Sequence, residues 1–450
     1  MPFASKHLSP AQLLAASIAG LIAVGTMLLW LPASSTREQL SLVDAFFTST
    51  SAVCVTGLIV VDTPADLSLF GQVVVLVLIQ AGGLGYMALT TVVAVALGRH
   101  LTVHERVTLQ EALNVHTMDG LIRFVLTVFK LTLVFESIGA ALLTGRWMWN
   151  GDMEFGRALY YGLFHSVSAF NNAGFALFSD SLIQYRGDWI VNVVILTLIV
   201  SGGVGFVVLT EVGRWRRDRR LSVHTRLVLT MTALLIGVAT VAFLVLEWRN
   251  PRTLGALAPE EAVLAAFFQA ITPRTAGFNT LDIGAMTGAS QFVLMILMFI
   301  GAAPGGTGGG VKVTTFAITV AALWATVRGL EEPAVFRRRL TPTLVARAFF
   351  IALIAFLALN GVAALLLITE GRALLPTLFE TTSAFGTVGL SMGEGGAPVS
   401  LAGHFSNPGK LLMVAMMFMG RVGPLTLAVA IARRGTPPRI RYPEGKVLVG

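Results

Sequence analysis

The sequence predicts an all-α integral membrane protein in which eight spanning helices form four parallel helix–re-entrant loop–helix repeats. Three observations predict this fold: the composition, eight long apolar segments, and four shorter stretches that each run into one glycine. Of the 450 residues, 55% are hydrophobic and 12% are charged, whereas a soluble domain carries about 25% charged residues. The single cysteine, Cys54, excludes an internal disulfide framework.

The long apolar segments extend over the whole chain, and crossing a bilayer takes about 20 such residues. They lie near residues 11–33, 67–98, 121–145, 188–213, 225–247, 290–328, 343–368 and 407–432. The first is too long for the apolar region of a signal peptide, so we expect it to be a spanning helix. A shorter stretch follows every second segment, at 43–57, 157–174, 261–277 and 374–389. These stretches are too short to span and are typical of re-entrant loops.

An internal repeat relates the four shorter stretches, which end at Gly57, Gly174, Gly277 and Gly389. A second glycine motif follows each of them, as GGLGY at Gly82, GGVGF at Gly202, GGTGGG at Gly305 and GRVGP at Gly420. We expect this motif to stay helical in all repeats except the third. The repeats comprise residues 1–104, 105–220, 221–335 and 336–450, the last including a cytoplasmic tail.

A re-entrant loop enters and leaves on one face, so the four repeats share one orientation and place their loops around a central pore. The predicted termini and inter-repeat loops hold 20 Lys and Arg residues, against 8 on the opposite face. This bias places both termini in the cytoplasm of a multi-pass protein of the cell inner (plasma) membrane. The clustering also explains the net charge of +8 without a nucleic-acid partner.

The four loops have the composition that a cation filter needs. A potassium ion can exchange its water shell for rings of backbone carbonyls, and glycine reaches the required positive φ without steric cost. We expect K+ at the backbone carbonyls of Val55, Thr56, Gly57, Asn172, Ala173, Gly174, Thr275, Ala276, Gly277, Thr387, Val388 and Gly389. The alternative for any single loop is that its glycine serves close helix packing; four copies at near-regular spacing favour the pore.

The segment 290–328 is interrupted in its middle by GAAPGGTGGGVK, which holds six glycines and a proline. Irregular backbone at membrane depth is tolerated where it is buried in protein or lines a watery cavity. The alternative is a simple packing kink.

The sequence resembles the Trk/Ktr/HKT potassium transporters in four features. These are SAFNNAGF in the second repeat, the PRTAGF loop, the glycine-rich break and an arginine in the last helix. The resemblance covers essentially the whole chain and is greatest to the KtrB-type membrane subunit. It implies potassium selectivity, because all four loops carry glycine, and it implies a homodimer with one pore per subunit. It further implies a cytosolic KtrA-type ring of regulatory subunits that binds ATP or ADP, which this chain would not bind itself.

The resemblance also implies that the glycine-rich break is an intramembrane gate below the filter. The gate would comprise Gly305, Gly306, Thr307, Gly308, Gly309, Gly310, Lys312 and Arg421. For Arg421, the alternative is a structural ion pair with Glu380 or another carboxylate. Arg274 is expected to brace the third loop from behind, and Lys130 and Glu136 each need a separate partner.

These observations predict potassium uptake, with no covalent cofactor and with Na+ as an open possibility for an activator. No P-loop, phosphorylatable aspartate motif or clustered nucleophile motif is found, so an enzyme is not expected. A sodium- or proton-coupled symporter would need an intramembrane carboxylate relay, for which Glu136 is the clear mid-span candidate. A less selective monovalent cation channel is the other alternative.

Overall fold

The computed structural model is almost entirely helical and describes residues 10–85, 120–394 and 398–431. Repeat 1 contains α1 (Pro10–Trp30), η1 (Pro32–Ser34), α2 (Leu42–Val53), α3 (Thr63–Asp66) and α4 (Leu69–Leu84), and repeat 2 contains α7 (Leu121–Trp149), α8 (Phe155–Phe170), η2 (Ile183–Tyr185), α9 (Trp189–Gly203) and α10 (Phe206–Asp218). Repeat 3 contains α11 (Val223–Glu247), η3 (Leu254–Ala256), α12 (Pro259–Ile271), η4 (Ile283–Ala285), α13 (Gly288–Phe299) and α14 (Val313–Val327). Repeat 4 contains α15 (Pro342–Glu370), α16 (Leu374–Gly386), η5 (Leu401–His404), α17 (Asn407–Val422) and α18 (Pro424–Ile431).

Four helices in the described part of the chain are long and apolar enough to cross a membrane: α1, α7, α11 and α15. Each opens one of the repeats, in agreement with the first expected span of each unit. They expose large apolar side chains, such as Phe356 and Leu357 of α15, which are more than half accessible. Such faces suit a lipid environment, because hydrocarbon is as apolar as these side chains.

The described second helix of each predicted repeat ends at its glycine motif, so the expectation that the motif stays helical in repeats 1, 2 and 4 is wrong. The backbone leaves the helix at Gly85, Gly205 and Gly423, with φ of +80°, +91° and +91°. In repeat 2 the break turns α10 by 104° from α9. Glycine ends a helix readily at positive φ, because it has no Cβ to clash with the backbone. The remainder of the expected span 67–98, beyond residue 85, lies outside the described residues.

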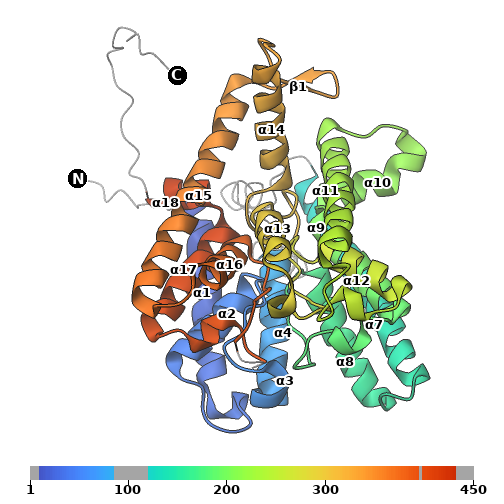
Figure 1. Ribbon diagram of the computed structural model, residues 1–450, viewed down its shortest axis with the longest axis vertical. Coiled ribbons are helices and arrows are strands. Elements are labelled where there is room, and N and C mark those ends of the chain that lie inside the picture. Colours follow the sequence, from blue (N-terminus) through green and yellow to red (C-terminus); the bar gives the residue numbers. More distant parts are fainter. Residues whose placement is uncertain (1–9, 86–119, 395–397, 432–450) are drawn as a thin grey trace.

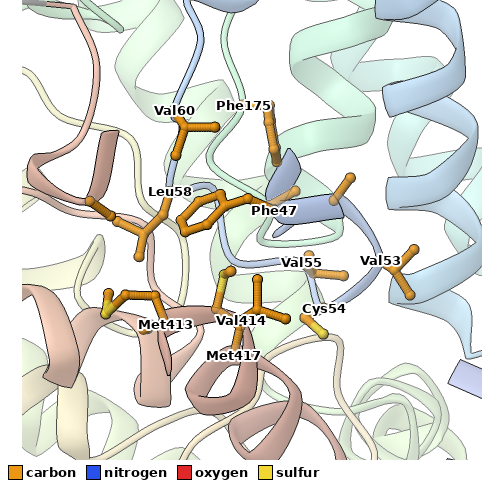
Figure 2. Packing of buried hydrophobic residues seen from close by; sticks show 14 of the residues in the cluster. Phe47, Val53, Cys54, Val55, Leu58, Val60, Phe175, Met413, Val414 and Met417 are labelled. Atoms are coloured by element: carbon orange, nitrogen blue, oxygen red, sulfur yellow. The ribbon is translucent and has the colours of Figure 1, made fainter. Parts of the chain in front are cut away.

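The repeats pack in a cycle. The second helix of each unit contacts the short re-entrant helix of the next, giving the pairs α4–α8, α9–α12, α13–α16 and α17–α2. The last pair joins the end of the chain to its beginning. Figure 2 shows this junction, where Met413, Val414 and Met417 of α17 pack near Val55 and other buried side chains of the first repeat.

A short β-hairpin, absent from the sequence prediction, connects α14 and α15. Its strands β1 (Ala334–Val335) and β2 (Arg338–Arg339) pair antiparallel. Phe336 and Arg337 form the turn with φ of 49° and 61°, and positive φ at both central residues is typical of tight hairpin turns. Figure 1 shows α14 and α15 side by side, with the hairpin region at their far end.

Candidate functional site

The four short helices α2, α8, α12 and α16 end in loops with the same backbone conformation. The residue two positions before each glycine is left-handed, with φ of 57° at Val55, 59° at Asn172, 74° at Thr275 and 50° at Thr387. The glycines themselves have φ of +88°, +70°, +78° and +93° at positions 57, 174, 277 and 389. Left-handed non-glycine residues are uncommon, so a shared pair in four separate loops indicates one repeated structural element.

Hydrogen bonds from each loop point back to its own helix. The amide of the residue before each glycine donates to a carbonyl in or just after the last helical turn: Thr56 N to Ser51 O (2.8 Å), Ala173 N to Ser168 O (2.7 Å), Ala276 N to Thr272 O (2.9 Å) and Val388 N to Ser383 O (2.9 Å). The Ser51 and Ser383 hydroxyls also accept from Gly57 N (3.0 Å) and Gly389 N (3.1 Å). These backbone amides of the loops therefore donate their hydrogen bonds to the helix that precedes each loop.

The carbonyl oxygens of the same loops have no such partners. Within residues 10–85, 120–394 and 398–431, the carbonyls of the twelve candidate filter residues accept no hydrogen bond. Buried carbonyl groups are almost always paired with a donor, with water or with an ion. Unpaired backbone carbonyls of this kind are groups that can replace the water shell of a desolvated cation.

The glycines of the four loops meet in cyclic order. A Cβ placed on Gly57 would lie 2.4 Å from Ala173 O, and one on Gly174 would lie 2.8 Å from Ala276 O. One on Gly277 would lie 2.2 Å from Val388 O, and one on Gly389 would lie 2.2 Å from Thr56 O. Each glycine thus abuts the carbonyl that precedes the next glycine, and the fourth loop closes on the first.

A cavity of about 820 Å³ opens on one side of this ring, and all four glycines line it. Its wall consists mostly of the segments that follow the glycines, including Ile59, Phe175, Asn279 and Leu390. Polar and apolar groups share the wall. The cavity adjoins the ring on the face from which the loops return.

The segment from Ile300 to Lys312 lies against the other side of the ring. Gly309 N donates to Thr387 Oγ1 at 2.9 Å, and a Cβ on Gly308 would lie 2.0 Å from Thr275 Oγ1. Both threonines belong to the candidate filter loops, so the segment passes directly behind two of them. It is an irregular stretch between α13 and α14 rather than a kinked helix, which excludes the simple packing kink.

Neighbouring repeats hold this segment along its length. Ala303 N and Thr307 N donate to Gly203 O (2.9 Å) and Gly202 O (3.1 Å) in the second repeat, and Gly310 N donates to Gly420 O (3.2 Å) in the fourth. Residues 301–303 and 307–311 are buried. The segment is therefore packed, with Pro304, Gly305 and Gly306 partly accessible at its bend and Lys312 partly accessible at its end.

Two cationic side chains donate hydrogen bonds to backbone carbonyls of the segment. Arg421 donates to Thr307 O and to Gly82 O and, at 3.4 Å, to Gly83 O. Lys312 Nζ donates to Gly308 O at 2.5 Å. The alternative of an ion pair between Arg421 and Glu380 is wrong, because Glu380 Oε1 instead accepts from Ala402 N at 2.9 Å.

The residues three positions before the glycines face the second helix of the preceding repeat. Asn171 lies against Gly83, since a Cβ there would meet Asn171 Oδ1 at 2.0 Å. Arg274 shares a small cavity with Gly203 and Thr232, away from the ring, and its Nη1 has no hydrogen-bond partner among the described residues. Arg274 therefore packs behind its loop, as the sequence predicts.

A polar triad, of which the sequence analysis singled out Glu136, supports the second loop. Glu136 of α7 accepts from Asn171 Nδ2 (2.9 Å) and from Gln80 Nε2 (3.2 Å), and Asn171 also donates to Gln80 Oε1 (2.9 Å). Gln80 lies just before the first glycine motif, but nothing in its sequence context separates it from an ordinary helix residue. Lys130, six residues before Glu136, is exposed, so the two charges do not pair.

His165 is a further support of the second loop. Its Nε2 accepts from Leu177 N at 3.2 Å, and its Nδ1 lies 2.8 Å from Tyr161 O. The imidazole thereby ties α8 to the segment that leaves the second loop.

Comparison with known proteins gives one consistent match. The family model of TrkH, described as a cation transport protein, matches residues 9–436. The chain is 42% identical to the Ktr system potassium uptake protein B of Bacillus subtilis, over 98% of this chain and 97% of that protein. It is 41% identical to the protein of the same name from Vibrio alginolyticus, over 96% and 93%. The crystal structure of the potassium transporter TrkH from Vibrio parahaemolyticus matches with a TM-score of 0.72 at 18% identity, over 96% and 87%.

Proposed function

The chain belongs to the TrkH family of cation transport proteins, and we propose that it is the ion-translocating subunit of a potassium uptake system in the cell membrane. The names of its relatives support potassium as the cargo. One observation carries the proposal: four left-handed glycine loops abut in a closed cycle and leave twelve carbonyls without a protein donor.

In this proposal the ring is the selectivity filter. Potassium enters from the wide cavity, loses water, and is coordinated by carbonyls of residues 55–57, 172–174, 275–277 and 387–389. The C-terminal ends of α2, α8, α12 and α16 lead into these loops, and the negative end of a helix dipole favours a cation. Selectivity then depends on the number and positions of the carbonyl dipoles, which the backward hydrogen bonds of each loop hold in place.

The segment Gly305–Gly310 is the gate of this proposal. It lies on the inner side of the filter, where Gly308 and Gly309 adjoin Thr275 and Thr387. Arg421 and Lys312 latch it through the carbonyls of Thr307 and Gly308. Opening would require these contacts to break, and the partly accessible residues 304–306 are where the segment has room to move.

We further assign the chain four repeats with the boundaries 1–104, 105–220, 221–335 and 336–450, and eight spans around the pore. Both termini lie in the cytoplasm, as the distribution of Lys and Arg indicates. The name "Ktr system" of the relatives supports a second component, for which we propose a cytosolic KtrA-type ring that binds ATP or ADP. The membrane subunit itself forms a homodimer.

Coupled symport with sodium or protons is the less favoured mechanism. A proton relay needs an intramembrane carboxylate with access to the ion path. Glu136 instead directs both carboxylate oxygens at the amides of Asn171 and Gln80. That arrangement supports a role in holding the second loop.

Ion flux into reconstituted vesicles tests the proposed function. Potassium and sodium are supplied separately, with and without gradients of sodium or pH. We expect potassium influx driven by its own electrochemical gradient, with sodium influx much lower and no requirement for a sodium or proton gradient. Influx that occurs only with such a gradient would favour symport, and equal influx of the two ions would favour a less selective channel.

A further inference from the structure

Each candidate filter glycine is followed at nearly the same distance by a carboxylate. Asp62, Asp282 and Glu394 come five residues after their glycines, and Asp180 comes six residues after its own. All four line the cavity of about 820 Å³ that also contains the four glycines. The repeat thus places one acidic side chain per unit in the entrance to the ring.

Asp62 is the most enclosed of these groups and has an oxygen without a partner. Its residue is 5% exposed, its Oδ2 accepts from Ser179 Oγ at 2.5 Å, and its Oδ1 has no hydrogen bond within the described residues. Ser179 belongs to the second repeat, so this contact joins two of the entrance segments. Burying a carboxylate oxygen is costly unless a cation or a donor compensates it, so the unpaired Oδ1 favours a cation in the adjacent cavity.

The other acidic groups are exposed in the wall. Asp282 Oδ1 accepts from Gly284 N at 2.9 Å, which fixes its carboxylate at the start of η4. Glu394 pairs with Arg372, so its charge is compensated. Arg252 is the cationic residue among those that line the cavity, and the wall stays negative because Asp62, Asp180 and Asp282 form no ion pair with another described residue.

We propose that this cavity is an electrostatic collecting site for hydrated monovalent cations, formed by Asp62, Asp180 and Asp282. This inference rests on the proposed function, since the ions collected are those that the ring conducts. A cavity of one sign with low-dielectric walls raises the local concentration of counter-ions. The cations remain hydrated here, because the carboxylates lie on separate segments, and in the described part of the chain no three acidic, histidine or cysteine groups form a metal cluster.

The magnitude follows from Coulomb's law. A unit charge about 10 Å from a cation in water changes its local concentration by about twofold. Removal of two charges should therefore raise the potassium concentration for half-maximal uptake by about fourfold at low ionic strength. The Debye length shrinks from about 30 Å at 0.01 M salt to about 8 Å at 0.15 M, so the shift should fall to about 1.5-fold at physiological ionic strength.

The test uses the full chain in vesicles, with Asp180→Asn, Asp282→Asn and the double variant. Glu260→Gln is the matched control, because Glu260 is exposed in the first turn of α12 and does not line the cavity. We expect a higher half-saturating potassium concentration at 0.01 M ionic strength in the double variant, an unchanged maximal rate, and no shift in the control. Asp62→Asn, which keeps an acceptor for Ser179, should add a further shift in the same direction.

Several outcomes overturn the inference. An unchanged half-saturating concentration at low ionic strength does so, as does a shift of equal size in Glu260→Gln. A shift that stays as large at 0.15 M as at 0.01 M salt, or a lower maximal rate without a shift, would show that the carboxylates act on conformation. Failure of the unmodified protein to transport potassium at saturating concentration would instead refute the proposed function.

Discussion

Alanine substitution of the four ring glycines should impair selectivity in an order that the structure sets. A Cβ on Gly277 or Gly389 would lie 2.2 Å from a carbonyl oxygen, one on Gly57 would lie at 2.4 Å, and one on Gly174 at 2.8 Å. Each of these oxygens belongs to the backbone of the next loop and cannot rotate away as a side-chain atom could. We therefore expect the loss of potassium over sodium selectivity to be largest for Gly277→Ala and Gly389→Ala and smallest for Gly174→Ala.

The size of the effect follows from the same distances. Real Cβ contacts essentially never fall below 3.0 Å, so Thr56 O must retreat by about 0.8 Å (3.0 minus 2.2 Å) in Gly389→Ala. The corresponding retreat of Ala276 O in Gly174→Ala is about 0.2 Å (3.0 minus 2.8 Å). A non-glycine residue in such a conformation adds strain of about 1–3 kcal/mol. If about 1.4 kcal/mol of the perturbation falls on ion coordination, selectivity changes by about tenfold.

The assay is separate potassium and sodium influx into vesicles that contain equal amounts of each variant. Gly237→Ala and Gly361→Ala are matched controls, because these glycines lie within α11 and α15 and a Cβ there meets nothing within 4 Å. Both controls should transport like the parent, since alanine favours a helix over glycine by about 1 kcal/mol. Equal selectivity in Gly389→Ala and the parent, or a larger loss in Gly174→Ala than in Gly389→Ala, would refute the steric reasoning.

Three further predictions concern the groups around the ring. Shortening Gly305–Gly310 should raise potassium flux without a change in selectivity, and unchanged or abolished flux in a folded variant would argue against a gate. Arg421→Gln should raise flux by about tenfold or more, because hydrogen bonds from a charged group contribute about 1.5–3 kcal/mol; Arg421→Lys should lie between it and the parent, and equal flux in all three would contradict the latch. Glu136→Gln should lower the thermal unfolding temperature in detergent and leave potassium influx per folded protein unchanged, because a third amide leaves one donor of Asn171 or Gln80 unpaired at a cost of about 1–3 kcal/mol; parent-like stability combined with lost potassium influx would favour a relay.

The candidate ring was predictable from the sequence because its chemistry is local. Gly57 and Gly389 each end a short helical stretch between two apolar segments, and their positive φ is a requirement of the individual loop. The same locality explains why the break at Gly305 was evident, since a run of glycines after Pro304 cannot continue a helix.

Other features depend on contacts between repeats and could not be read from one segment. Gly202, near the end of α9, lies so close to Phe170 O that a Cβ on it would be 1.8 Å away. No neighbouring residue in the sequence indicates this contact. One partner of Glu136 is the side-chain amide of Gln80, which lies 56 residues earlier in the chain. From the sequence, Arg421 could equally have paired with Glu380. Only the folded structure shows that it donates to the backbone carbonyls of Thr307 and Gly82 instead.

The contacts of Arg421 also bear on how far the chain can be divided. The guanidinium belongs to the fourth repeat, but its acceptors Thr307 and Gly82 belong to the third and the first. A half made of the first two repeats lacks the arginine and the proposed gate, and a half made of the last two lacks one of the acceptor carbonyls. Neither half contains all of these contacts, so we expect a split version of this protein to regain gated conduction only when both fragments associate.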